Sequence, residues 1–218
     1  MKIVQCWDDG NVDDIRLISL LRKYNARASF NLAPGLHRSE RYLSWKYEGN
    51  KEVWRLALPE FRDVYKGFPI SSHSLTHPHL EELPENEVRR EVFDAKDCLE
   101  QIFSSAIIGF AYPFGTYNEM VQSIVHEAGH HYARTTGSTT KAWPVSNAME
   151  FHPSCFHLDS DFWQIYEQVK VDNGVFYFWG HSYEFVTEAD WQSFEAKIAR
   201  MADDPAVEWA DLPDLFTK

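Results

Sequence analysis

Short apolar runs recur along the chain and predict β-strands. They occupy residues 3–7, 28–32, 68–72, 107–112, 131–135, 150–156 and 175–181, with a weaker run at residues 207–210. None of these predicted strands is longer than seven residues, which is the length expected of strands in a globular sheet. The pattern therefore predicts seven strands, or eight if the weak run is included.

Segments with helical periodicity lie between these runs. The clearest spans residues 84–103, where the apolar positions are four, three, four and three residues apart: Val88, Val92, Ala95, Leu99 and Ile102. Pro84 suits the first turn, where its missing N–H costs nothing. Further helices are expected at residues 12–24, 51–65, 119–127, 161–169 and 188–201.

Alternating strands and helices predict parallel strands joined by crossover helices. Seven or eight such units would close into a barrel, but 218 residues are few against the roughly 250 of a regular eight-fold barrel. We therefore expect an α/β fold with a distorted or incomplete (β/α) barrel, as a single domain over residues 1–218. In this reading Trp45, Tyr47 and Trp54 lie in a long loop and helix between two strands.

Composition and charge narrow the function classes. Hydrophobic residues make up 44% and charged residues 25%, as in ordinary globular domains. The net charge of −12 disfavours binding to nucleic acid or to an anionic membrane surface. The longest uncharged apolar run, residues 106–114, has nine residues, about half of what spans a bilayer. No signal-peptide pattern begins the sequence, so a cytoplasmic protein with three reduced cysteines is expected.

Several predicted strands end in residues that can bind metal or titrate. The first ends in Asp8 and Asp9, the third runs into His73 and His77, and the seventh ends in His181. Parallel α/β folds place their working groups at the carboxyl ends of the strands. The five side chains are therefore expected at one end of the barrel.

Each of these signals also has a structural interpretation. Two aspartates before a glycine are typical of a turn with a helix cap, and a single histidine is often a hydrogen-bonded part of the core. In the functional interpretation, one of the adjacent carboxylates binds a cation and the other stays free. Two histidines and a carboxylate form the three-ligand set of a catalytic zinc-like ion.

The combination of these motifs resembles the polysaccharide deacetylase family, carbohydrate esterase family 4. The matching segments are CWDDG at residues 6–10, HSLTH at 73–77, FAYPFG at 110–115 and a late strand that ends in His181. The family signatures are T-F-D-D-G, H-S/T-x-x-H, R-x-P-Y/F and L-x-L-H. The resemblance covers residues 1 to about 185, with the motifs in the family's order.

The resemblance implies a role for each matching position. Asp8 would be the general base and His181 the general acid, and the backbone N–H of Phe114 would help to hold the oxyanion. The metal ligands would be Asp9, His73 and His77. Zinc suits these ligands, although cobalt, nickel and manganese fit similar sites.

The third motif lacks the family's arginine, because Ala111 stands at that position. In the family this arginine is thought to orient the catalytic aspartate. Arg134 in the next strand is our candidate for a replacement, since a fixed guanidinium can hold a carboxylate in place. The alternative is that Arg134 pairs with some other carboxylate.

Other departures concern the surroundings of His181. No D-x-x-D-W stretch is present, and Asp159 and Asp161 are the nearest candidates for an acid that raises the pKa of His181; helix capping is the alternative. Trp179 shares a strand face with His181 and is expected either to line a pocket for the acetyl methyl group or to pack in the core. Tyr112 is expected to contact the substrate.

The expected activity is metal-dependent removal of acetyl groups from an acetylated oligo- or polysaccharide. The linkage is either an N-acetyl amide or an O-acetyl ester, because the same residues serve both. One alternative is an inactive carbohydrate-binding barrel that has lost the motif-three arginine. Another is a metal-dependent phosphoesterase or nuclease, which the net charge of −12 disfavours.

Overall fold

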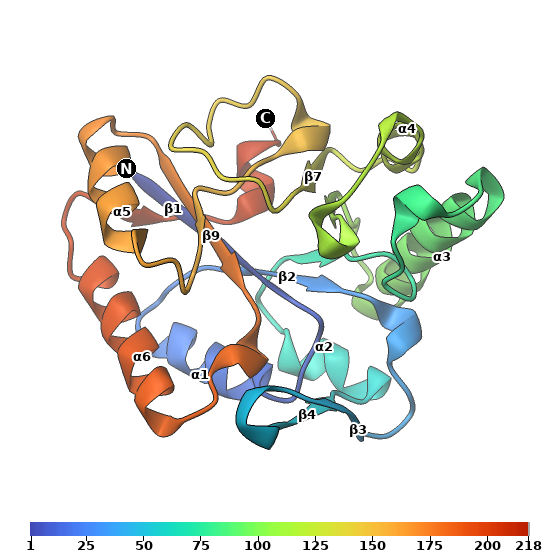
Figure 1. Ribbon diagram of the computed structural model, residues 1–218, viewed down its shortest axis with the longest axis horizontal. Helices are drawn as coiled ribbons and strands as arrows, with labels where there is room; N and C mark the ends of the chain where they lie inside the picture. The colour runs from blue at the N-terminus through green and yellow to red at the C-terminus, as the bar shows by residue number, and fades with distance from the viewer. Residues whose placement is uncertain (218) are drawn as a thin grey trace.

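A curled parallel sheet forms the centre of the molecule, in a computed structural model that describes residues 1–217 (Figure 1). Seven strands follow the order β7-β6-β5-β2-β1-β9-β8, and β10 pairs with β1. Every pairing in this sheet is parallel. The strands are β1 (Lys2–Asp8), β2 (Ser29–Leu32), β5 (Ile70–Ser72), β6 (Gly109–Ala111), β7 (Tyr132–Arg134), β8 (Cys155–Phe156), β9 (Val175–Gly180) and β10 (Glu208–Trp209). The predicted class, an incomplete (β/α) barrel in one domain, is confirmed.

The strand β1 lies inside the sheet and pairs with three other strands. It pairs with β9 over most of its length, while β10 pairs with its amino half and β2 with its carboxyl half. The edge strands β7 and β8 do not pair with each other, and an isolated parallel bridge between Arg134 and Phe151 crosses part of the gap. Because the strands are parallel, the ends of β1, β5, β6, β7 and β9 meet on one side of the barrel.

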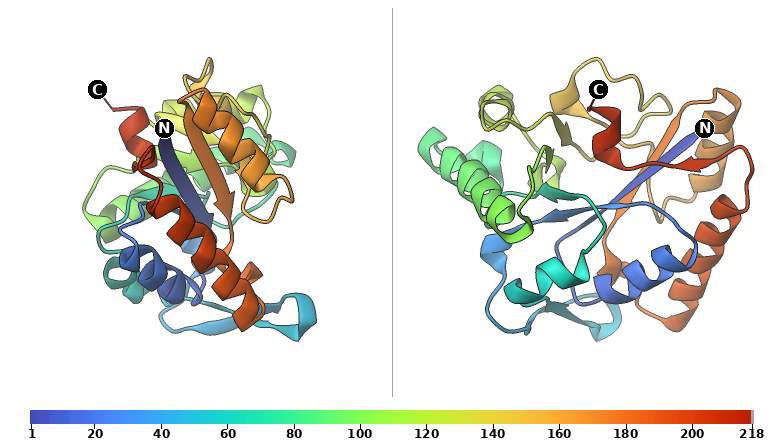
Figure 2. Two further views of the ribbon diagram at one scale, coloured as in Figure 1. Left: turned by 90° about the vertical axis from the view of Figure 1, so that its left-hand side faces the viewer. Right: turned by 180° about the vertical axis from the view of Figure 1, so that it is seen from behind.

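Helices pack around the outside of the sheet (Figure 2). The α-helices are α1 (Asp14–Lys23), α2 (Phe61–Val64), α3 (Glu85–Phe103), α4 (Glu119–Glu127), α5 (Phe162–Val171) and α6 (Glu188–Ala202). The 3₁₀ turns are η1 (Pro34–Leu36), η2 (Glu48–Asn50), η3 (Leu58–Glu60), η4 (Leu80–Glu82), η5 (Pro113–Gly115), η6 (Ala148–Glu150), η7 (Ser182–Glu184) and η8 (Leu212–Leu215). The predicted apolar stripe of α3 is buried, as Val88, Val92, Ala95 and Leu99 show.

The helix predicted at residues 51–65 is present only in its carboxyl-terminal part, as η3 and α2, and is wrong for the residues before them. Residues 42–55 instead form an antiparallel hairpin of β3 (Tyr42–Lys46) and β4 (Glu52–Arg55). Burial alternates along β4, with Val53 and Arg55 inside, which is the period of a strand. Pro59 also prevents a continuous helix, because it cannot donate the hydrogen bond that a helix interior requires. Trp45 and Trp54 therefore lie on a hairpin and not in a loop and helix.

Two further expectations can be compared with the structure. The three cysteines, Cys6, Cys98 and Cys155, are free thiols. Among the helices of residues 1–217, none combines the length and apolar character that a membrane-crossing segment needs.

Candidate active site

The predicted site residues converge where the strands of the barrel end. A cavity of ≈ 230 Å³ opens there and contains all nine of them in its lining: Asp8, Asp9, His73, His77, Tyr112, Phe114, Arg134, Trp179 and His181. Gly115, Thr136 and Tyr183 complete the wall. The resemblance implied six of the nine. Arg134, Trp179 and Tyr112 were separate expectations from the sequence, and Tyr183 was not expected.

The turn after β1 separates the two adjacent carboxylates. Asp8 is the last residue of β1, and Asp9 leaves the strand with a φ of 84°, in the left-handed region that side chains rarely adopt. Gly10 follows with a φ of 69°, and a Cβ atom there would lie 2.8 Å from the ring of His37. This reversal lets Asp9 join the two histidines while Asp8 stays between Arg134 and His181.

Asp9, His73 and His77 form a compact group of potential metal ligands. Each offers one ligand atom, and these atoms lie within 4.8 Å of one another. The Nδ1 atom of His73 lies 2.8 Å from the carbonyl oxygen of Ala111, which leaves Nε2 for the site. An imidazole held in this way by its second nitrogen is typical of metal-binding histidines.

The loop between the two histidines is shaped by Glu91 on α3. Its carboxylate accepts hydrogen bonds from the backbone N–H groups of Leu75 and Thr76, at 3.0 and 2.7 Å. The backbone of His77 has a φ of 58° and donates to the hydroxyl of Ser74 at 2.9 Å. The HSLTH motif is therefore a tight loop and not a helix.

The Asp8 carboxylate is buried among donors and cations. Asn31 donates to Oδ1 at 2.6 Å, the guanidinium of Arg134 donates to Oδ2, and Nε2 of His181 lies 3.8 Å from Oδ2. Burial alone would raise the pKa of Asp8, but the charges of Arg134, His73 and His181 outweigh it and lower this pKa to about 2. Asp8 is therefore ionised at neutral pH.

Arg134 lies on the strand beside the position where the family's arginine is missing. Its strand neighbour in register is Ala111, the residue that stands at the family's arginine position. From the adjacent strand, the buried guanidinium reaches Asp8 and lies 4.8 Å above the ring of Trp179. The carboxylate that Arg134 pairs with is thus Asp8.

His181 faces Asp8 from the end of β9 and is held by an acid that the sequence analysis did not identify. Its Nδ1 lies 2.9 Å from Oε1 of Glu184, and its backbone N–H donates to Oε2 of the same carboxylate at 2.9 Å. Burial opposes the charged form, but Glu184, Asp8 and Asp9 outweigh it and raise the pKa of His181 to about 9. The Oε2 atom of Glu184 also lies 2.7 Å from Nε2 of the buried His157.

Neither of the acids proposed for that position contacts His181. Asp159 accepts the backbone N–H of Phe156 at 2.9 Å, and Asp161 precedes α5 without a side-chain cap bond. The usable signal for Glu184 was its spacing, since an acid three residues after a histidine lies one 3₁₀ turn away.

Aromatic rings form the walls of the cavity. Trp179 faces His181, with ring centroids 5.5 Å apart, and Tyr112 is fully buried, with its hydroxyl donating to the carbonyl of Met149 at 3.0 Å. Phe114 is 52% exposed, and its ring stacks on His79 at 3.9 Å. One wall is thus rigid and the Phe114 side is open to solvent.

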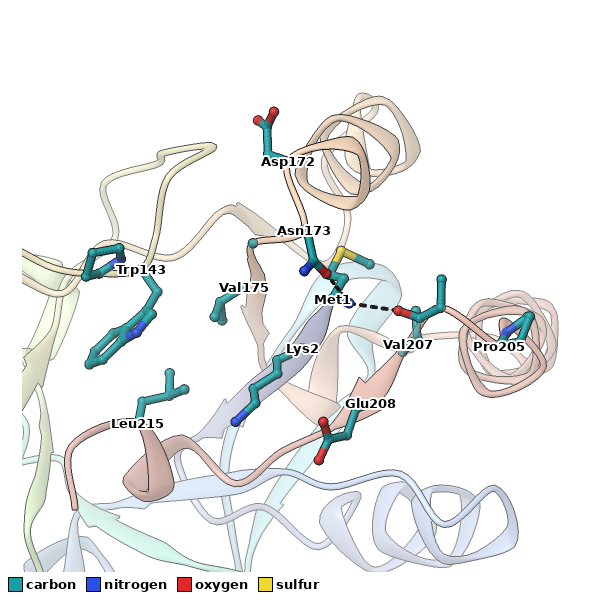
Figure 3. A pocket seen from close by; sticks show the side chains of 13 residues that line it. Met1, Lys2, Trp143, Asp172, Asn173, Val175, Pro205, Val207, Glu208 and Leu215 are labelled. Carbon is teal, nitrogen blue, oxygen red and sulfur yellow. Dashed lines mark hydrogen bonds between the residues drawn. The ribbon is translucent and has the colours of Figure 1, made fainter. Parts of the chain in front are cut away.

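A larger cavity of ≈ 640 Å³ lies at the opposite end, where β1 begins (Figure 3). Figure 3 shows Lys2 and Glu208 in its wall, and the terminal ammonium of Met1 donates to Oδ1 of Asn173 at 2.9 Å. Two groups of potential metal ligands occur within residues 1–217, and neither lies in this wall. The chemistry-bearing side chains are gathered in the smaller cavity.

The fold and this cluster of residues match what the resemblance to polysaccharide deacetylases implied. Comparison with known proteins leads to the same family. A family model described as polysaccharide deacetylase matches residues 1–133. This match covers more than half of the chain, so the chain belongs to the polysaccharide deacetylase family.

Individual relatives extend the comparison. The chain is 24% identical over 132 residues to a Bacillus subtilis protein named "Putative polysaccharide deacetylase YxkH", covering 60% of this chain and 43% of that protein. It resembles the Streptococcus pyogenes deacetylase PplD in complex with acetate, at 25% identity and a TM-score of 0.56, over 67% of this chain and 61% of that one. The family 4 carbohydrate esterase of Streptomyces lividans shares the fold at 14% identity and a TM-score of 0.60, over 94% of this chain and 90% of that one.

Proposed function

We propose that this chain is a metal-dependent hydrolase that removes acetyl groups from an acetylated oligo- or polysaccharide. Membership of the polysaccharide deacetylase family supports carbohydrate deacetylation. One observation carries the rest of the proposal. Asp8 and His181 face each other in opposite charge states beside the ligand group of Asp9, His73 and His77.

The ligand group suits a divalent ion such as zinc. Two imidazoles and one carboxylate are a common set in catalytic zinc sites, which keep further positions open. The set fits here because the three ligand atoms lie within 4.8 Å of one another and His73 is oriented by Ala111. A bound ion supplies Lewis acidity, which lowers the pKa of water and polarises the acetyl carbonyl.

Asp8 is proposed as the general base. Asn31 and Arg134 each occupy one lone pair of its two oxygens, so the carboxylate is fixed in direction and still has lone pairs free for a water proton. Its pKa of about 2 keeps it ionised, although a base this weak depends on an acidified water. Arg134 is proposed to hold this orientation.

His181 is proposed as the general acid. Its pKa of about 9 keeps it protonated at neutral pH, so it can donate a proton to the departing nitrogen or oxygen. The backbone N–H of Phe114 is proposed to donate to the developing oxyanion, where one such donor is worth about 10²–10³ in rate. Trp179 and Tyr112 are proposed to surround the acetyl group.

The alternative function, an inactive carbohydrate-binding barrel, is less well supported by the structure than by the sequence alone. That alternative depended on the loss of the arginine at Ala111, and Arg134 supplies a guanidinium to Asp8 from the neighbouring strand.

Acetate release from a panel of N- and O-acetylated oligosaccharides tests the proposal. We expect release from at least one substrate, loss of release with a chelator and recovery when zinc is returned. Whether acetate is released from the N-acetylated or from the O-acetylated oligosaccharides identifies the linkage that the protein cleaves. Binding without acetate release would favour the inactive barrel, and phosphate release from phosphoester controls would favour a phosphoesterase; either result contradicts the proposal.

A further inference from the structure

The hairpin of residues 42–55 is fastened to the turn that follows β9. Lys51 donates from Nζ to the carbonyl oxygen of Phe185 at 2.8 Å and pairs with Asp13 at 3.0 Å. Figure 1 shows β3 and β4 crossing the end of the barrel where β9 finishes. The hairpin therefore lies beside the turn η7, whose residue Tyr183 lines the candidate site.

A second set of contacts joins the hairpin to the turn after β1. The N–H of Val12 donates to the carbonyl of Trp54 at 2.9 Å, and the N–H of Leu56 donates to that of Gly10 at 3.2 Å. The buried guanidinium of Arg55 donates to the carbonyl oxygen of Asp9. With attachments to both turns, the hairpin is held as a fixed part of the site.

The inner face of the hairpin supports one ring of the cavity wall. The ring of Trp45 meets that of Tyr183 edge-on at 5.1 Å, and Tyr47 meets it at the same distance. Tyr183 in turn lines the cavity, with its ring centroid 4.9 Å from that of His181. A chain that left the cavity past Tyr183 would have to pass through this aromatic group.

The cavity is open on the side of Phe114. Phe114 is 52% exposed there, and no comparable hairpin covers it in the part of the chain that the structure describes. The cavity volume of ≈ 230 Å³ is below the roughly 300–1,000 Å³ of pockets that enclose drug-sized ligands. The space beside His181 thus suits the acetyl-bearing end of a substrate that continues in one direction only.

We infer that the hairpin closes one end of the substrate cleft and that Tyr183, supported by Trp45 and Tyr47, makes the chain selective for acetyl groups on a terminal sugar. This inference rests on the proposed deacetylase function. It names Tyr183 as a specificity residue, because the ring restricts which sugar reaches the site and takes no part in the bond changes.

The test compares two tetrasaccharides that each carry one acetyl group, on a terminal or on an internal sugar, in the linkage that the acetate panel identifies. We expect the wild type to favour the terminal substrate by about ten-fold or more in kcat/KM, a typical effect of a steric wall on selectivity. Trp45→Ala and Tyr183→Ala should each raise the internal-to-terminal ratio by about ten-fold.

Two control variants test whether a change in this ratio comes from the loss of the aromatic rings around Tyr183. Trp54→Ala removes the same residue type from the same hairpin, but Trp54 is 41% exposed and its side chain bonds only with Glu52 in the described residues, so the ratio should not change. Tyr183→Phe keeps the ring and should keep the ratio. A loss of activity common to both substrates cancels in this ratio.

The outcomes separate the two proposals. If the wild type releases acetate equally from both substrates, or if Tyr183→Ala leaves the ratio unchanged, the hairpin does not set specificity and only this inference is overturned. If no acetate is released from either substrate, the proposed function itself is contradicted.

Discussion

The Asp8 carboxylate is the residue on which the proposed chemistry depends. It is 1% exposed, and without a partner its charge would be costly in such a place. Arg134 and Asn31 offset the cost of burying this charge by donating hydrogen bonds to the carboxylate. They therefore keep Asp8 ionised and hold its carboxylate in a fixed orientation. The same pair of donors prevents the carboxylate from turning away from the water that it would deprotonate.

Replacement of Arg134 by methionine tests this arrangement. We expect kcat/KM to fall by about 10²-fold because Asp8 loses its orientation. The free energy of unfolding should also fall, by about 3–5 kcal/mol, because a buried charge is left unpaired. The measurements are steady-state kinetics and denaturant unfolding.

A double variant separates the two effects. Asp8→Asn with Arg134→Met removes both charges, so the stability should largely recover while the activity stays low. An Arg134→Met variant that retains turnover within about two-fold of wild type would remove the proposed role of Arg134.

At the scale of single residues, the sequence predicted those site residues that lie in recognisable motifs. Asp8, Asp9, His73, His77 and His181 lie together as the resemblance implied. Tyr183 and Glu184 were missed because their positions depend on the turn η7 that follows β9. The sequence signalled only Glu184, through its three-residue spacing from His181, and gave no signal for Tyr183.

The 3₁₀ turn η7 sets the hydrogen bonding and the pKa of His181. The turn brings the Glu184 carboxylate to the ring and to the backbone of His181, and it places the second carboxylate oxygen against His157. Gly180 permits this close packing, because a Cβ atom there would lie 2.2 Å from the His157 ring. The turn thus connects the end of β9 to the protonation state of the proposed acid.

Glu184→Gln should shift the pH dependence of kcat/KM. His181 must be protonated to act, so activity should fall as the pH rises through its pKa of about 9. Glu184 raises this pKa, and its neutral replacement should therefore move the alkaline fall to lower pH. Asp159→Asn is the matched control and should leave the profile unchanged, since Asp159 bonds to the backbone of Phe156. An alkaline midpoint that stays the same in Glu184→Gln would contradict the role of this turn.

Elements with a strong local pattern were predictable, and those set by distant contacts were not. The helix α3 follows its apolar stripe and α4 has the predicted bounds. The hairpin was not predicted, because its aromatic residues are spread along both strands and its two halves fitted a loop and the start of a helix. Its contacts with Gly10 and Phe185, which decide the fold of this segment, join residues far apart in sequence.

For the molecule as a whole, the order of the strands explains why one end of the barrel holds the chemistry. The strand β1 lies between β2 and β9. His181 follows β9 directly, and His73 follows β5, which lies on the other side of β2. Alternation along the sequence predicted a parallel, incomplete barrel. The strand order and the partial closure by the Arg134–Phe151 bridge could not be predicted, because they depend on pairings over long sequence distances.

The proposed function depends most on whether Asp9, His73 and His77 hold a catalytic ion beside Asp8. The most direct measurement is the metal content of purified protein by elemental analysis, together with acetate release, for the wild type, Asp8→Asn and His73→Ala. His131→Ala, at an exposed histidine, serves as the control. We expect about one ion per chain in the wild type, the control and Asp8→Asn, with activity lost in Asp8→Asn. In His73→Ala, both the ion and the activity should be lost. Equal metal content in His73→Ala and the wild type, or full activity in Asp8→Asn, would contradict the proposed function.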